Sequence, residues 1–322
     1  GGYFLVSDMH PSLDESVIIA GVQYLTFSGT KTLKAQRINN NGTAAWLNQV
    51  AVMENNSLQF GNFPDFISDT SGGAFFTWYG VGPLQCYANH ITHDGQPWPV
   101  GQVQVASGLG STQRVNPVAV LSGAEFVVFF RTLDNSQNND GIAAQQFTSA
   151  GNAVWGSGGV SLKPTSNTPQ YGSFAASITN AGPVLCFTEA PSWGTDVINS
   201  VCLNGMGNPV WTPEFLSIAS TPSSKSRIAM GSTIDGVLLA WQDDRTGVNN
   251  IYGQRVNSTG TLGNANVCLG DIDSDGYVGV SDLLQMIDAW GVCGPACVED
   301  LDSDGFVSVS DLLILIDAWG TC

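Results

Sequence analysis

A repeat of slightly more than 50 residues constrains the fold of this chain more than any other feature of its sequence. A turn glycine followed a few residues later by tryptophan recurs in the segments 35–46, 88–98, 144–155 and 200–211, and a version without tryptophan occupies 253–263. The five glycines are separated by 53, 56, 56 and 53 residues, and they are Gly42, Gly95, Gly151, Gly207 and Gly260. This regularity indicates one structural unit copied five times.

Each unit also contains a short apolar run upstream of its glycine, at 16–21, 73–78, 125–130, 183–187 and 236–241. These runs are rich in β-branched and aromatic residues, which predicts buried strands. About four strands in about 50 residues is the size of a propeller blade. The fifth unit lacks a closing strand, and residues 1–7 resemble the closing strands at 101–107 and 158–164. We therefore predict a mainly β chain in which residues 1–265 form a five-bladed β-propeller closed by the N-terminal strand; a pair of β-sandwiches is the alternative.

The fifth unit reads "GVLLAWQDDRTGVNNIYGQRVNSTGTLG". It resembles the repeats of secreted bacterial propellers of the W-x-D-x-R…Y-x-Q-R type. That resemblance implies a shape and does not imply a particular chemistry.

Residues 266–322 carry most of the charge imbalance. The chain has a formal net charge of −17, and this segment holds 11 of the 27 acidic residues and none of the 10 lysines and arginines. A chain this acidic lacks the cationic face that nucleic acid requires. A short segment with so many like charges should fold only when a cation neutralises it. No apolar run reaches the ~20 residues needed to cross a membrane.

The acidic segment contains two copies of a 12-residue pattern, 29 residues apart, with carboxylates at positions 1, 3, 5 and 12 and glycine at position 6. This is the ligand spacing of a calcium loop, in which residue 7 adds a backbone carbonyl. We predict two calcium ions. Their ligands would be Asp271, Asp273, Asp275, Tyr277 and Asp282 in the first loop, and Asp300, Asp302, Asp304, Phe306 and Asp311 in the second.

The loop-then-helix pairs, with Asp at position 12 and no preceding helix, resemble type I dockerins over residues 268–322. The resemblance implies a small all-α calcium-binding domain at 266–322. It also implies a protein partner, either a cohesin-like module or another copy of this chain, with Val280–Ser281 and Val309–Ser310 at the interface.

Four cysteines follow the same repeat. A nine-residue helix is roughly 14 Å long, which disfavours a bridge between the two ends of one unit. An antiparallel pair of units brings the start of one to the end of the other, so we expect the disulfides Cys268–Cys322 and Cys293–Cys297, with a zinc site as the rival. Disulfides in a small module favour a secreted, extracellular or cell-surface protein. Cys186 and Cys202 either face each other across a hairpin or remain free thiols.

The carboxylates of the propeller do not form a matched set on its innermost strands, as a glycosidase would require. Those considered are Asp14, Asp69, Glu125, Glu189, Asp235 and Asp243, of which Glu189 is the strongest candidate. We therefore assign no catalytic residue and no cofactor besides calcium. We expect a secreted, non-catalytic binding or structural protein that binds a protein partner and carbohydrate; a carbohydrate-active enzyme with a dockerin-like tail is the alternative.

Overall fold

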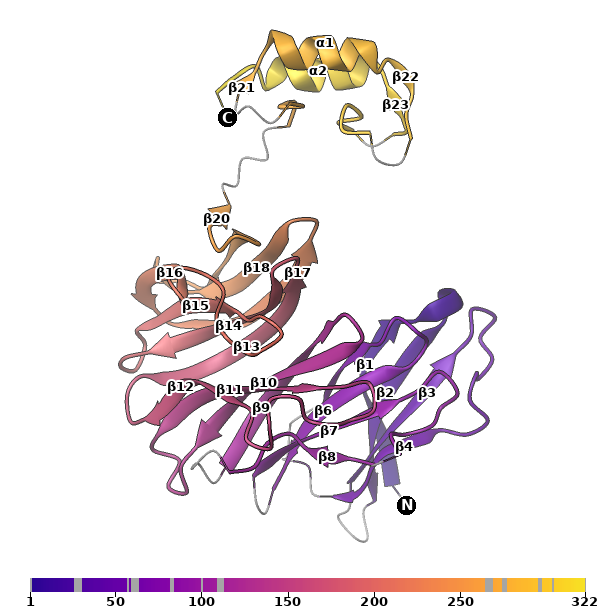
Figure 1. Cartoon of the computed structure of the whole chain (residues 1–322), viewed down its shortest axis with the longest axis vertical. Helices are drawn as coiled ribbons and strands as arrows, with labels where there is room; N and C mark the ends of the chain where they lie inside the picture. The colour runs from indigo at the N-terminus through magenta and orange to yellow at the C-terminus, as the bar shows by residue number, and fades with distance from the viewer. Residues whose placement is uncertain are drawn as a thin grey trace. The chain divides into compact units, whose positions relative to one another are not determined.

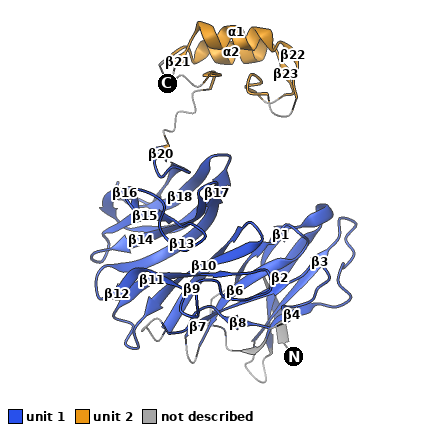
Figure 2. Ribbon diagram, viewed as in Figure 1, with its two compact units in different colours: residues 1–262 blue, residues 263–322 orange. Residues whose placement is uncertain are grey.

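The structure is a computed structural model that describes residues 2–25, 31–56, 58, 64–81, 84–99, 101–108, 113–263, 269–273, 277–294, 297–302 and 304–321. The chain divides into two compact units, Gly1–Leu262 and Gly263–Cys322 (Figure 2). The sequence places the boundary three residues later, at 265/266.

The described part of the first unit is mainly β and contains five four-stranded antiparallel sheets, each made of four consecutive strands (Figure 1). The first sheet consists of β1 Gly2–Pro11, β2 Val17–Leu25, β3 Lys31–Ile38 and β4 Val50–Asn56. The second consists of β5 Asp65–Ser68, β6 Ala74–Gly80, β7 Gln85–Ile91 and β8 Val103–Gln104. The third consists of β9 Gln113–Ser122, β10 Glu125–Leu133, β11 Asp140–Phe147 and β12 Val160–Ser166. The last two consist of β13 Gln170–Thr179, β14 Gly182–Ala190, β15 Asp196–Cys202 and β16 Leu216–Ser223; and β17 Lys225–Thr233, β18 Gly236–Asp243, β19 Asn250–Asn257 and β20 Leu262–Gly263.

The N-terminal strand belongs to the first sheet, so the prediction that residues 1–7 complete the last blade is wrong. β1 pairs with β2 from Gly2 opposite Leu25 to Pro11 opposite Val17. The fifth sheet takes its own fourth strand from Leu262–Gly263. The connection between β1 and β2 is a short turn that includes the 3-10 helix Leu13–Glu15. Closing so short a loop costs much less entropy than joining two chain segments some 250 residues apart.

Four hydrophobic clusters fill the interfaces between successive sheets, because the central strands bury side chains on both faces. Between the second and third sheets, for example, the Phe75 and Phe126 rings stack with centroids 4.1 Å apart. Burial on both faces explains why the apolar runs of the sequence do not alternate with polar residues. Cys86, Cys186 and Cys202 are free and buried in these clusters; Cys186 lies opposite Ser200, not Cys202.

The tryptophan of the repeat links each sheet to the next. Its indole Nε1 donates a hydrogen bond to a backbone carbonyl in the turn of the following repeat, beside the turn glycine. The donor and acceptor residues are Trp46 and His93, Trp98 and Ser149, and Trp211 and Ser258, each at 2.8 Å, and Trp155 and Gly205 at 3.0 Å. The fifth repeat has no sheet after it in sequence, and it is the repeat that lacks tryptophan.

The turn glycine is required at these interfaces for two reasons. Gly95 has φ +74°, a left-handed conformation that side chains disfavour. A Cβ atom on Gly95 would also lie 2.8 Å from Cγ of Trp46, so only glycine allows the turn to pack on the indole. Gly42, in the first repeat, has a similar φ of +82° but nothing within 4 Å of a Cβ, since no tryptophan precedes it.

The second unit contains the helices α1 Val280–Asp288 and α2 Val309–Asp317 and the short strands β21 Tyr277–Val278, β22 Gly291–Val292, β23 Phe306–Val307 and β24 Gly320–Thr321. The expected all-α domain is therefore corrected to a helix pair with two small sheets. β21 pairs with β24 and β22 with β23, so the start of each repeat meets the end of the other. Val278, Met286, Val307 and Leu315 form the centre of its core.

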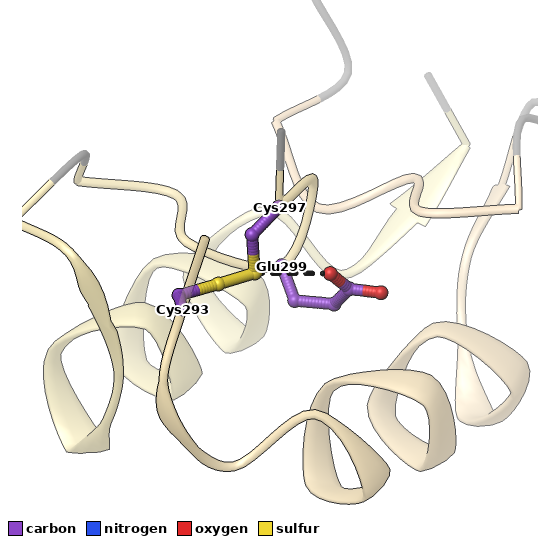
Figure 3. A group of neighbouring side chains, drawn as sticks. All are labelled: Cys293, Cys297 and Glu299. Carbon is purple, nitrogen blue, oxygen red and sulfur yellow. Dashed lines mark hydrogen bonds between the residues drawn. A yellow bond between two sulfur atoms is a disulfide. The ribbon is translucent and has the colours of Figure 1, made fainter. Parts of the chain in front are cut away.

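The predicted Cys293–Cys297 disulfide is confirmed, with the Cα atoms 5.8 Å apart (Figure 3). Glu299 Oε2 lies 3.2 Å from Cys297 Sγ. Because both sulfurs are bonded to each other, this pair supplies no thiolate to the rival zinc site. Cys268 and Cys322 lie outside the described residues.

We predict that Gly95→Ala destabilises the first unit more than Gly42→Ala does. Both substitutions place a side chain in the left-handed backbone region, which costs ~1–2 kcal/mol of folding free energy. Gly95→Ala adds overpacking against Trp46, for a further ~1–3 kcal/mol. The free energy of unfolding, measured by urea denaturation, should separate the two variants; equal losses would contradict the inter-sheet role of Gly95.

Candidate functional site

The carboxylates considered from the sequence have structural partners. Asp69 accepts hydrogen bonds from the backbone of Ser71 and Gly73, both at 2.8 Å, and pairs with His90 Nε2 at 2.7 Å. Burial raises the pKa of Asp69, but these hydrogen bonds outweigh it and lower the pKa to about 2. The remaining contacts are Asp14 with Arg37, Glu125 with Gln146, Glu189 with Asn199 and Lys163, and Asp235 with Arg255.

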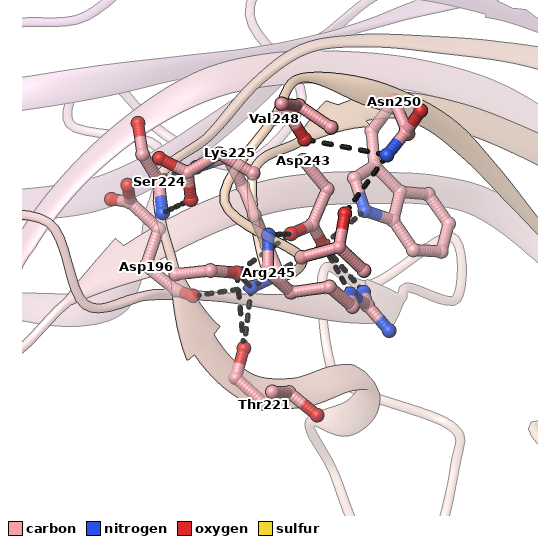
Figure 4. Close-up of polar contacts among 12 residues, drawn as sticks. Asp196, Thr221, Ser224, Lys225, Asp243, Arg245, Val248 and Asn250 are labelled. Atoms are coloured by element: carbon pink, nitrogen blue, oxygen red, sulfur yellow. Dashed lines mark hydrogen bonds and ion pairs between the residues drawn. The ribbon is translucent and has the colours of Figure 1, made fainter.

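Asp243 holds together the W-x-D-x-R motif of the fifth repeat (Figure 4). Its fully buried carboxylate accepts hydrogen bonds from Trp241 Nε1 at 3.1 Å, Ser223 Oγ at 2.7 Å and the Arg245 guanidinium, and Lys225 Nζ lies 3.5 Å away. Burial raises the pKa of Asp243, yet these donors lower it well below its ordinary value. A carboxylate so enclosed has a structural role.

Three other residues gather on the first strands of the first two sheets. On β1, Asp8 and His10 are two residues apart and therefore share a face, and His10 Nε2 lies 3.0 Å from Asp8 Oδ2. Asp65 begins β5 and lies opposite Thr77 on β6. One ligand atom each from Asp8, His10 and Asp65 lies within 4.8 Å of the others. The His10 ring also packs edge-on against Phe66, with centroids 4.6 Å apart.

Asp8 and Asp65 occupy matching positions in their sheets. Each lies three residues before the end of its strand, at Pro11 and Ser68, where the hairpin to the second strand begins. A β-bulge between Val6 and Asp8 shifts the register of β1 just before Asp8. Bulges re-aim side chains and are frequent beside active sites. The two carboxylates therefore reach one point from two sheets.

The first strand is also irregular in three further sheets. β9, β13 and β17 each contain a bulge, with Asn116, Ser173 and Arg227 at φ +52°, +44° and +55°. Positive φ is uncommon outside glycine and often accompanies functional sites. These positive-φ residues lie six residues before the ends of their strands, whereas Asp8 and Asp65 lie three residues before the ends of theirs.

A cavity of about 220 Å³ lies beside Asp65. Thr77, the cross-strand neighbour of Asp65, is 1% exposed and lines this cavity. Its Oγ1 has no hydrogen-bond partner among the residues that the structure describes. A buried hydroxyl without a partner costs free energy, which a bound ligand or water would recover. The other lining residues are Pro64, Trp78, Tyr79, Asn116, Pro117, Val118 and Phe174.

The environment of Asp65 favours its protonated form. The side chain is exposed to solvent, but the surrounding protein desolvates the carboxyl and raises its pKa. Asp8 raises it slightly further, while the Phe66 amide and His10 act in the opposite direction. A carboxyl with a raised pKa beside a second carboxyl is the arrangement that acid–base catalysis uses. Two carboxylates and an imidazole are also donors suitable for a divalent metal.

The predicted calcium ligands are brought together in both loops of the second unit. One carboxylate oxygen each from Asp271, Asp273 and Asp282 lies within 4.8 Å of the others, and Asp300, Asp302 and Asp311 repeat the arrangement. Asp275 lies outside the described residues. Tyr277 and Phe306, predicted to contribute carbonyls, begin β21 and β23.

Backbone amides close each loop. The carboxylate of Asp282 is fully buried and accepts from Ile272 at 2.7 Å, Asp273 at 3.2 Å and Gly279 at 2.8 Å. Burial raises its pKa, but these amides lower it overall, and Asp311 behaves alike.

In the second loop, Asp300 accepts from the amides of Asp304 at 3.1 Å and Gly305 at 2.9 Å. Asp304 in turn accepts from Phe306 N at 2.8 Å. Ionised carboxylates converging in a tight turn offer the hard oxygen donors that calcium takes, so the residues fit the ion.

Comparisons with known proteins give neighbours in fold only. No family model and no curated protein matches the chain. Among solved structures, an α-L-arabinofuranosidase from Fusarium graminearum is 8% identical, over 78% of this chain and 81% of that one, at a TM-score of 0.44. An endo-arabinase from Bacteroides thetaiotaomicron is 13% identical, over 65% and 78% of the chains, at a TM-score of 0.40. The chain covers 34% of a prolyl endopeptidase that is 10% identical over 79% of this chain, at a TM-score of 0.46.

These neighbours contradict our expectation of a non-catalytic binding or structural protein, and that expectation is corrected. They are enzymes, and most of them are glycoside hydrolases. At such identities the likeness concerns the fold, so an activity has to be argued from the residues of this chain.

We predict that Asp65→Asn raises the melting temperature at pH 7. Because the pKa of Asp65 is raised in the folded state, the folded protein loses stability as pH rises from the unfolded-state pKa through the folded-state pKa of this carboxyl. The side-chain amide introduced by Asp65→Asn does not ionise, so the variant avoids that loss. The gain should shrink towards pH 3, where the wild-type carboxyl is protonated in both states. Calorimetry from pH 3 to pH 8 measures it, with Asp14→Asn as an exposed control; an unchanged or lowered melting temperature at pH 7 would refute the effect.

Proposed function

We propose that the first unit is a five-bladed β-propeller that hydrolyses glycosidic bonds with Asp8 and Asp65. The observation that carries the proposal is the pair itself: two carboxylates at matching positions of neighbouring inner strands, one of them with a raised pKa, beside a cavity. Asp65 would act as the acid, because desolvation by the surrounding protein raises its pKa and so favours the protonated form. Asp8 would act on the opposite side of the sugar carbon.

The separation of the carboxylates favours a double displacement. Their ligand oxygens lie within 4.8 Å of each other, which is below the ~6.5–9.5 Å that leave room for an attacking water in inverting glycosidases. Asp8 would attack the anomeric carbon as Asp65 protonates the departing oxygen. Asp65, now a base, would then take a proton from the water that releases the sugar from Asp8. His10, at 3.0 Å, would orient the Asp8 carboxylate.

The cavity fits an uncharged, hydroxylated ring. Thr77 Oγ1 and the exposed Asn116 amide supply polar groups, whereas Tyr79 and Phe174 supply aromatic surface. No lysine or arginine lines the cavity among the described residues. These features support a neutral sugar as the substrate class.

We predict that Asp8→Asn and Asp65→Asn differ in their dependence on the leaving group. Loss of the nucleophile should lower kcat/KM by roughly 10²–10⁴-fold on every substrate. Loss of the acid in Asp65→Asn should lower kcat/KM to a similar degree for alkyl glycosides. It should lower kcat/KM only weakly for 2,4-dinitrophenyl glycosides, because their leaving group needs no protonation. Proton NMR of the first product should show retained anomeric configuration.

The controls are Glu189→Gln, which lies outside this pair, and Asp69→Asn, which removes a turn carboxylate. Both should keep near wild-type kcat/KM once folded. Absence of hydrolysis across a panel of neutral glycosides, or wild-type rates in both Asp8→Asn and Asp65→Asn, would reject the proposed function.

For the second unit we propose a dockerin-like module that binds two calcium ions through its aspartates and attaches the enzyme to a protein partner outside the cell. Its helices expose apolar side chains at equivalent positions of the two repeats. The exposed fraction is 63% for Val280 and 60% for Val309, and 61% for both Leu284 and Leu313. Such symmetric apolar surface supports docking to a cohesin-like module or a second copy of the chain.

The Cys293–Cys297 disulfide supports an oxidising, extracellular location. Neither described helix is long and apolar enough to span a membrane.

We predict that chelation opens the second unit and leaves the first folded. Without the ion, the aspartates of each loop repel one another. Limited proteolysis of the full chain with and without EGTA should show new cleavage within 263–322 only. Asp282→Ala should give that cleavage in calcium as well, whereas Asp288→Ala, at the end of α1, should not. Identical digestion patterns with and without calcium would contradict calcium binding.

A further inference from the structure

A second concave surface of the first unit lies at the turns of the fourth and fifth sheets. It is a groove of about 840 Å³, within the size range of small-molecule sites. Its lining comes from the start of β13, the β14–β15 turn and the residues that flank β17 and β18. The lining residues include Ser192, Trp193, Gly194, Asp196, Ser224 and Asp244. None of them belongs to the site of Asp8 and Asp65.

Trp193 is the unusual residue of this groove. Its relative exposure is 101%, whereas the repeat tryptophans are largely buried. A tryptophan carries roughly 150–250 Å² of mostly apolar surface, and folding normally buries it. Exposure at the rim of a groove therefore indicates a surface that a ligand covers.

The turn that carries Trp193 is held in one conformation. Thr195 Oγ1 donates to the Ser192 carbonyl at 2.7 Å and accepts from Ser192 N at 3.1 Å, and Thr195 N also donates to Ser192 O at 3.2 Å. Gly194 has φ +74° with open space around it, which completes the tight turn. The indole is thus presented by an ordered turn, which limits the entropy lost on binding.

The polar part of the lining is also fixed. Asp196 Oδ2 accepts from Lys225 N at 3.1 Å, and Asp244 Oδ1 accepts from Ser224 N at 2.8 Å. Among the described residues, no hydrogen bond is formed by the second carboxylate oxygen of Asp196 or of Asp244. These two oxygens can therefore accept hydrogen bonds from a ligand. Figure 4 shows Asp196 and Ser224 against the buried network of Lys225 and Asp243.

The charge of the lining selects the ligand. It has two aspartates and no lysine, arginine or histidine, and the chain as a whole is strongly acidic. Anions are therefore repelled, whereas hydroxyl groups can donate to the two carboxylates. An uncharged ring with an apolar C–H face for the indole and hydroxyls at its edge matches both parts of the groove.

We propose that this groove, with Trp193 as its stacking platform, is a binding site for neutral polysaccharide chains, separate from the Asp8–Asp65 site. It would hold a polymer against the first unit whether or not the unit cleaves that polymer. Its ligand class follows from its own lining and does not rest on the proposed hydrolysis.

Affinity electrophoresis of the full chain tests the proposal, with arabinan, arabinoxylan, hydroxyethylcellulose and, as an anionic polymer, polygalacturonate in the gel. We expect at least one neutral polymer to retard the protein and polygalacturonate not to. Trp193→Ala should weaken the apparent affinity at least roughly tenfold, as loss of an anchoring aromatic residue does. Trp193→Tyr should recover much of the binding.

Two controls separate this site from the other. Ile234→Ala removes a side chain that is 96% exposed on another turn of the fifth sheet and should bind like wild type. Asp65→Asn should also bind like wild type, so a failed hydrolysis assay leaves this proposal standing. No retardation by any neutral polymer, equal binding by wild type and Trp193→Ala, or preference for polygalacturonate would overturn it.

Discussion

The architecture of the first unit depends on one hydrogen bond repeated four times, in which a tryptophan of one sheet donates to the turn of the next. At Gly95, Gly207 and Gly260 the indole also packs under the turn glycine. The contact is specific, because the indole Nε1 needs a carbonyl at one place and the turn must approach without a Cβ, as Gly95 does over Trp46. Hydrophobic clusters supply most of the burial between sheets, but they are tolerant of orientation. The tryptophan contact fixes the register of each sheet against its neighbour.

That fixed register allows residues distant in sequence to act together. Asp8 and Asp65 reach one point because their sheets are packed together and both residues lie three residues before the end of the first strand of their sheet. The bulge of β1 lies directly before Asp8, where it re-aims the side chain. A rigid scaffold that places carboxylates on the first strands of neighbouring sheets would preorganise the proposed acid–base pair, and its turns, such as the one with Trp193, would present the proposed recognition surface.

The second unit works by a different physical principle. Its core of four fully buried residues is small, and repulsion among aspartates opposes its folding. Backbone amides and the Cys293–Cys297 disulfide hold its loops, and a divalent ion would supply the remaining neutralisation. The helices leave the side chains of Val280, Leu284, Val309 and Leu313 exposed. A chain with these two units would combine a stable catalytic body with an attachment module that responds to calcium.

The sequence by itself determined what is local or repeated: the five units, the apolar strands, the two loop–helix copies and the Cys293–Cys297 bridge, because periodicity and short spacings leave few alternatives. Only the tertiary structure decided which sheet takes β1, since residues 1–7 resemble closing strands but a short turn joins them to β2. That misplacement hid Asp8, and Asp65 stood out in no motif. Their meeting depends on the register between two sheets, a property that emerges only when the sheets pack.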